Sequence, residues 1–181
     1  MHQIKIVGIS GSLRKNSSNT NILKSIAAFA PAEVSFHLFE GLEDLPHFNP
    51  EKEDGTPAVQ AFRKLIQEAN GIIICTPEYA FGVPGSLKNA LDWLVSSNDI
   101  NEKPVAAISA SPTHMGGDKA LASLLLTLSA LGTNMNEKSA LSIAAVSKKI
   151  GNEGKVNDEE TINQLKSILD NLLEQIDMGH L

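Results

Sequence analysis

The chain has 181 residues, of which 42 % are hydrophobic and 20 % are charged, and this composition excludes a disordered chain. The length fits one domain, residues 1–181, with a substantial core. The formal net charge of −6 argues against a nucleic acid as partner, because binding to phosphates needs a basic surface.

The first predicted element is a strand at residues 4–9, an apolar run near the start of the sequence. No basic segment or long apolar run precedes it, so we expect no signal peptide. No window approaches the ~18 apolar residues that a membrane span needs, so we expect no membrane partner. These features predict a cytoplasmic protein.

The segment between this strand and a predicted helix at 20–30 is rich in small hydroxyl side chains and contains Arg14. Backbone amides at a helix start point at an oxyanion, and the helix dipole favours its charge. A guanidinium adds a charge-assisted fork. The segment therefore predicts a phosphate site, and the alternative is a turn whose serines only cap the helix. The candidate short donors are Ser10, Ser12, Ser17, Ser18, Asn19 and Thr20.

Two common nucleotide loops are excluded by the glycine spacing. Gly8 and Gly11 are too close for a Walker loop, and no Gly-Lys-Ser/Thr follows them. They are also the only glycines before Phe39, so the dinucleotide fingerprint fails. A serine-rich monophosphate loop of the kind found after the first strand of flavodoxin-like sheets remains.

The next elements are a strand at 34–39, a long loop at 40–56 and a helix at 58–69. The strand alternates polar and apolar residues, which predicts an edge strand. The loop either covers the site or a partner surface, or it is simply surface. Pro57 stands near the start of the helix, where a proline is well tolerated.

The third strand, 71–76, is a continuous apolar run that contains the chain's single cysteine, Cys75. One cysteine excludes a disulfide framework, and we expect a core residue rather than a nucleophile. The loop at 77–82 presents Tyr79 and Phe81 as flat surfaces before a helix at 85–96. A flat heteroaromatic ring could stack there. Ring and phosphate together describe a flavin mononucleotide.

The remaining pattern predicts strands at 105–109 and 140–146 and helices at 117–131 and 159–178, and 133–138 is ambiguous. Alternation of apolar strands with helices predicts an α/β fold with right-handed crossovers. We expect a flavodoxin-like three-layer sandwich, with helices on both faces of a five-stranded parallel sheet of order 2-1-3-4-5. In that order ligands bind beyond the carboxyl ends of the first and third strands.

Several motifs resemble the NAD(P)H-dependent FMN reductase family, which includes quinone, azo-dye and chromate reductases. The resemblance covers roughly residues 1–140. Its motifs are Gly11-Ser-Leu-Arg14 with Ser17 and Asn19, Thr76-Pro-Glu-Tyr79 with Pro84-Gly85 and the run from Leu87 to Trp93, and a glycine-rich loop from Ser109 to Asp118. One departure is Ala80-Phe81, because many members have asparagine after the Pro-Glu-Tyr. That change puts the surroundings of the ring and the substrate preference in question.

The resemblance implies the site residues. Ser12, Arg14, Ser17 and Asn19 would bind the phosphate with the backbone of Leu13, and Ser10 belongs to the same cradle. The ring would contact Pro77, Glu78, Tyr79, Ala80, Phe81 and Gly82, chiefly through the main chain of Glu78, Tyr79 and Phe81. Its other edge would face Ser111, Thr113, His114 and Gly116, although His114 could equally be a solvated loop residue.

The resemblance also implies an FMN-dependent enzyme that uses NADPH or NADH. Hydride would pass from the nicotinamide to the flavin and then to a quinone, free flavin or azo compound, by ping-pong kinetics. The flavin performs this chemistry, so we expect no catalytic side chain, and no residue cluster predicts a metal site. The alternatives are a flavodoxin-type electron carrier and a non-catalytic sensor or scaffold. Family members are usually homodimers or homotetramers, with the third helix and the flavin loop at the interface.

Overall fold

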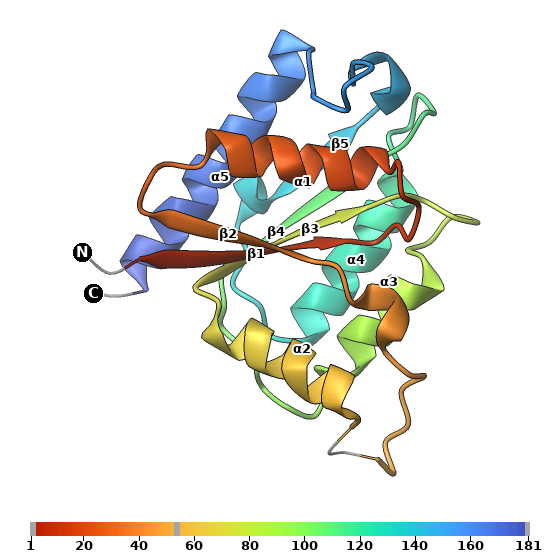
Figure 1. The fold of residues 1–181 in the computed structure, drawn as a ribbon, viewed down its shortest axis with the longest axis vertical. Coiled ribbons are helices and arrows are strands. Elements are labelled where there is room, and N and C mark those ends of the chain that lie inside the picture. The colour runs from red at the N-terminus through yellow and green to blue at the C-terminus, as the bar shows by residue number, and fades with distance from the viewer. Residues whose placement is uncertain (1–2, 53–54, 180–181) are drawn as a thin grey trace.

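The computed structural model of the chain describes residues 3–52 and 55–179, so the predicted domain and the loop at 40–56 each include residues outside these ranges. Its centre is a parallel sheet of order β2-β1-β3-β4-β5, as predicted (Figure 1). The strands are β1 (Ile4–Ser10), β2 (Val34–Phe39), β3 (Gly71–Thr76), β4 (Val105–Ala110) and β5 (Ala140–Ile143).

Five α-helices cover the sheet in the part of the chain that the structure describes. They are α1 (Ser18–Phe29), α2 (Pro57–Glu68), α3 (Gly85–Asp92), α4 (Asp118–Ala130) and α5 (Glu159–Met178). Figure 1 shows α1 and α5 on one face and α2, α3 and α4 on the other. The predicted three-layer sandwich is therefore confirmed.

The side chains of the inner strands explain why both faces need helices. All six residues of β3 are buried, and successive side chains point to opposite faces. Ile72 and Ile74 belong to the core beneath α2, α3 and α4, whereas Ile73 and Cys75 belong to the core beneath α1 and α5. Burying each isoleucine contributes about 2 kcal/mol, so the two-sided apolar run strongly favours a central strand.

Two predicted boundaries were wrong by three residues or more. Helix α3 ends at Asp92 rather than at 96, because the amides of Leu94 and Val95 bond three residues back, to Leu91 and Asp92. Strand β5 ends at Ile143 rather than at 146. Ala145 adopts a left-handed φ of 51°, and its amide donates to the carbonyl of Thr113 in the loop after β4.

The ambiguous segment at 133–138 forms no strand of its own. Asn134 makes an isolated parallel bridge with Pro104, and a short 3-10 helix at Glu137–Ser139 follows. Two more 3-10 helices, Leu42–Asp44 and Val146–Lys148, join the described elements.

The long loop after β2 is attached to α3 and its end. The indole Nε1 of Trp93 donates to the carbonyl of Pro46 at 2.8 Å, and the amide of Phe48 donates to Asn89 Oδ1 at 2.8 Å. The rings of Phe48 and Trp93 also meet edge to face, 5.1 Å apart. The described part of the loop near these residues is thus packed, and Trp93 is a core residue.

Candidate active site

Three loops begin side by side at the carboxyl edge of the sheet: residues 11–17 (the phosphate loop), 77–82 (the ring loop) and 111–117 (the third loop). The amide of Gly11 donates to the carbonyl of Cys75 at 2.8 Å, so the phosphate loop leaves β1 in contact with β3. A Cβ on Gly11 would lie 2.8 Å from Thr76 Oγ1, which only glycine avoids. Figure 1 shows the ends of β1 and β3 together.

The phosphate loop lies over the start of α1. Ser17 is the N-cap residue, and its side chain accepts a hydrogen bond from the amide of Thr20. The first amides of a helix have no intrahelical acceptor, so this end of α1 offers donors to an anion. Ser12 is half-buried, whereas Leu13 and Arg14 are exposed.

A cavity of about 280 Å³ opens beside this loop, between it and the end of β2. Arg14, Lys15 and Lys24 line it, and within the described chain none of them forms an ion pair. Glu40 and Glu43 line it as well, so the cations exceed the carboxylates by one, and Arg14 and Lys15 lie just before the start of α1, where an anion is favoured. The sequence analysis assigned neither Lys15 nor Lys24 to the site. Lys24 lies on the second turn of α1, outside the motif.

Two predicted phosphate ligands brace the loop. Ser10 is buried, and its Oγ accepts from Thr20 Oγ1 at 2.9 Å and from the amide of Ser12 at 3.4 Å. Asn19 is buried too, and its Oδ1 accepts from the Cys75 thiol at 3.3 Å. Burial raises the pKa of that thiol, so Cys75 stays protonated and is the expected core residue.

The ring loop contains a tight turn. The amide of Tyr79 donates to the carbonyl of Gly82, and the amide of Gly82 donates to the carbonyl of Tyr79, both at 3.0 Å. The two central residues have left-handed φ values, 49° at Ala80 and 63° at Phe81, as in a type I′ turn. Tyr79 is 52 % exposed and Phe81 80 % exposed, so both flat surfaces are accessible.

This turn changes which main-chain donors the ring loop can offer. Pro77 has no amide hydrogen, and the amides of Tyr79 and Gly82 are used within the turn. In the described structure, the amides of Ala80 and Phe81 at the tip have no acceptor. These two amides are the available donors of the turn, rather than that of Tyr79.

The Glu78 side chain of the ring loop turns toward α4. Its Oε2 accepts from the amides of Lys119 and Ala120, each at 3.0 Å. The resemblance predicts the main chain of Glu78 as a ring contact and its side chain as a loop anchor or an interface residue rather than a base, without identifying the partner. No local signal marks this contact, since its partners lie about forty residues further along the chain.

The third loop folds back on β5. Ser111 is buried and shares a hydrogen bond with Thr113 Oγ1 at 3.0 Å, and the carbonyl of Gly116 accepts from Ser109 Oγ at 2.9 Å. Gly116 has a φ of 63°, and a Cβ there would collide with Ser142 Oγ. His114 is exposed, and no hydrogen bond links it to the described residues.

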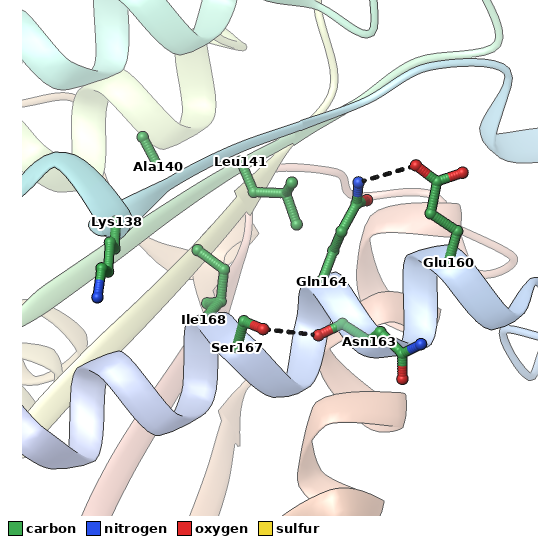
Figure 2. A pocket seen from close by; sticks show the side chains of 8 residues that line it. All are labelled: Lys138, Ala140, Leu141, Glu160, Asn163, Gln164, Ser167 and Ile168. Carbon is green, nitrogen blue, oxygen red and sulfur yellow. Dashed lines mark hydrogen bonds between the residues drawn. The ribbon is translucent and has the colours of Figure 1, made fainter.

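A separate cavity of about 390 Å³ lies between β5 and α5 (Figure 2). Ala140, Leu141 and Ile168 line its apolar part, and Lys138 and polar side chains of α5 line the rest. Two of these bond along their own helix, Gln164 to Glu160 and Ser167 to the carbonyl of Asn163. None of the predicted site residues lines this cavity, so it is not the site described above.

Two further features are absent from the described residues. Among them, no group of three or more His, Cys, Asp or Glu side chains could hold a metal ion. No helix between residues 3 and 179 is long and apolar enough to cross a membrane.

Comparison with known proteins gives consistent results. Residues 4–148 match the family described as NADPH-dependent FMN reductase. A quinone reductase of Escherichia coli K12 is 32 % identical over 169 residues, 90 % of each chain. An NAD(P)H-dependent FMN reductase of Pseudomonas aeruginosa is 31 % identical over 161 residues, 87 % of this chain and 86 % of its own.

A solved structure agrees with these sequence relatives. The flavoenzyme NAD(P)H:(acceptor) oxidoreductase of Paracoccus denitrificans superposes with a TM-score of 0.86 and 31 % identity. The match covers 97 % of this chain and 98 % of that one.

Proposed function

This chain belongs to the NADPH-dependent FMN reductase family, so it is an FMN-dependent oxidoreductase driven by NAD(P)H, and we propose how its residues carry out that activity. The proposal is that hydride passes from the nicotinamide to a quinone or similar small acceptor by ping-pong kinetics. One observation carries it: the Gly11–Cys75 hydrogen bond joins the first residue of the phosphate loop to β3, two residues before the ring loop begins.

The phosphate loop fits the phosphate of FMN. Ser12, Arg14, Ser17 and the backbone of Leu13 would hold the dianion at the start of α1, where the helix dipole favours negative charge. Lys15 and Lys24 add positive charge to the same cavity. The contacts of Ser10 and Asn19 within the fold keep the loop in shape for these ligands.

The ring loop and the third loop would hold the flavin ring between them. The amides of Ala80 and Phe81 provide donors for its polar edge, and Tyr79 provides an aromatic surface. Ser111, Thr113, His114 and Gly116 would lie against the other edge. When bound, FMN supplies the hydride-transfer chemistry. The protein's part is to orient the ring and to place donors where negative charge develops.

If the nicotinamide and the acceptor occupy the same place one after the other, the kinetics are ping-pong. We expect parallel double-reciprocal lines when NADPH and a soluble benzoquinone are varied together. Intersecting lines would show that both substrates bind at once, which contradicts the shared place.

A direct test separates a reductase from an electron carrier. FMN-loaded protein is mixed with NADPH without oxygen, and absorption near the flavin maximum is followed. Rapid bleaching, reversed by benzoquinone, is the result expected of a reductase. Flavin that binds and stays yellow would identify a carrier, and failure to bind FMN would identify a non-catalytic relative.

We further propose that residues 1–181 form one flavin-binding domain and that the enzyme is a cytoplasmic homodimer or homotetramer. The exposed apolar side chains of Phe81 and Val95, on the ring loop and just beyond α3, support an interface there. Sedimentation of the purified protein tests the assembly, and a monomer at micromolar concentration would contradict it.

A further inference from the structure

Helix α4 begins without a capping side chain of its own. Its N-cap residue is Gly117, which has a left-handed φ of 82° and can offer no side-chain acceptor. The first amides of a helix need acceptors, and an uncapped start is costly when it is partly buried. In this protein the acceptor comes from another loop, because Glu78 Oε2 takes hydrogen bonds from the amides of Lys119 and Ala120.

A carboxylate suits this place for two reasons. One oxygen accepts two amide hydrogens, and bonds to a charged acceptor are stronger than neutral ones. The charge also lies at the positive end of the α4 dipole. Glu78 also lies directly beside this helix start, since a Cβ on Gly117 would be in ordinary van der Waals contact with the Cβ of Glu78, at 3.4 Å.

The ring loop has few other attachments. Its turn closes on itself through Tyr79 and Gly82, and Thr76 Oγ1 bonds the carbonyl of Pro77 at its base. Within the described residues, the Glu78 side chain makes the only hydrogen bonds from residues 77–82 to a helix. The loop nevertheless holds Ala80 and Phe81 in left-handed conformations that residues with a side chain disfavour.

We propose that Glu78 is a positioning residue that clamps the ring loop to the start of α4 before any flavin binds. The clamp fixes the tip amides of Ala80 and Phe81, and it also fixes the ring loop relative to the third loop, which leads into α4. The importance of this geometry for flavin binding rests on the proposed function. The clamp itself is a property of the protein without flavin.

Hydrogen exchange of the flavin-free protein tests the clamp with three variants. Glu78→Ala removes the acceptor, and Glu78→Gln keeps an oxygen without the charge. Asp118→Asn is the matched control, because it removes one charge from the same helix start, where Asp118 pairs with the Lys119 side chain and not with the ring loop.

We expect the hydrogen-bonded amides of the ring loop, those of Tyr79 and Gly82, and the amides of residues 119–120 to exchange about tenfold faster in Glu78→Ala, the loss typical of a removed cap. Glu78→Gln should restore part of the protection, and Asp118→Asn should leave residues 78–83 unchanged. Faster exchange at 119–120 alone would make Glu78 only a helix cap and would overturn the clamp. The clamp would also be overturned if Asp118→Asn made the ring-loop amides exchange as fast as they do in Glu78→Ala.

A second measurement addresses the flavin. The visible circular dichroism of bound FMN reports the asymmetry around the ring, and we expect it to change in Glu78→Ala and to recover partly in Glu78→Gln. An unchanged spectrum in Glu78→Ala contradicts the positioning role. If the wild-type chain binds no FMN, the proposed function fails, and the exchange data still decide the clamp.

Discussion

Ala80 occupies a backbone conformation that its side chain disfavours. Its φ is 49° in a type I′ turn, where glycine and asparagine are the favoured residues. A left-handed conformation costs a residue with a Cβ about 1 kcal/mol. We therefore expect Ala80→Gly or Ala80→Asn to raise the free energy of unfolding by up to about 1 kcal/mol, measured by urea denaturation.

Ala122 is the matched control for Ala80→Gly. It is exposed in the middle of α4, where glycine should lower the free energy of unfolding by about 1 kcal/mol. Opposite signs at the two positions would isolate the effect of the turn. Destabilisation at both would mean that the turn gains nothing from glycine.

Arg14 is the strongest candidate for a direct phosphate contact. Its exposed guanidinium lines the cavity beside the phosphate loop and has no ion-pair partner among the described residues. Arg14→Ala should weaken FMN binding by about 1.5–3 kcal/mol, the worth of a charge-assisted pair. Titration of flavin fluorescence measures this change.

Lys155 provides the control for Arg14, because it is an exposed cation that pairs only with Glu153. Lys155→Ala should leave FMN affinity unchanged. If both variants lose affinity equally, net charge rather than a specific contact explains the result. Unchanged affinity in Arg14→Ala would refute the assignment.

At the scale of elements, most of the fold could be predicted because its signals are local. The apolar runs of β1, β3 and β4 and the alternation in β2 identify the strands without any tertiary information. The error at the end of β5 occurred where a distant contact decides the structure. Ala145 leaves β5 because its amide bonds Thr113, and the sequence around Ala145 carries no sign of that partner.

The candidate site shows the same division. Its loops could be located, because parallel strands bring their carboxyl ends to one edge. The roles of single side chains could not be predicted, since Asn19 bonds Cys75 and Glu78 bonds α4 across long separations in sequence. Side-chain direction depends on neighbours that only the assembled fold provides.

Helix α5 has an N-cap whose contribution depends on pH. Asp158 accepts from Thr161 Oγ1 at 2.6 Å and from the Thr161 amide at 3.0 Å, and these bonds, with a smaller effect of Lys149, lower the pKa of its carboxyl. Because the folded-state pKa lies below the unfolded one, the cap stabilises fully above the unfolded pKa. Its contribution is lost as pH falls through the folded pKa.

Asp158→Ala should therefore destabilise the protein at pH 7, and the difference from wild type should shrink as the solution becomes acidic. Urea denaturation between pH 7 and pH 3 measures both curves. Glu159→Gln, at the exposed first residue of α5, should show a smaller effect. A difference that stays constant with pH would exclude the carboxylate as its source.

At the scale of the whole molecule, the proposed flavin site is continuous with the central sheet. The three loops begin at the carboxyl ends of β1, β3 and β4, which are neighbouring strands in the middle of the sheet. A ligand held by these loops should therefore stabilise the folded chain as a unit. For a ligand at 100 times its dissociation constant, the gain in unfolding free energy is about 2.7 kcal/mol.

FMN and riboflavin differ only in the phosphate. Comparing the two ligands therefore shows how much of the gain in unfolding free energy comes from the phosphate loop. At this chain length the gain from FMN corresponds to a rise in melting temperature of about 5–10 °C. Riboflavin at the same concentration should give a much smaller rise, because it leaves the start of α1 and Arg14 without an anion. The two melting curves are measured by differential scanning fluorimetry or, where flavin emission interferes, by circular dichroism. Equal shifts would mean that the phosphate loop contributes nothing to binding and that the contacts with the ring alone hold the flavin.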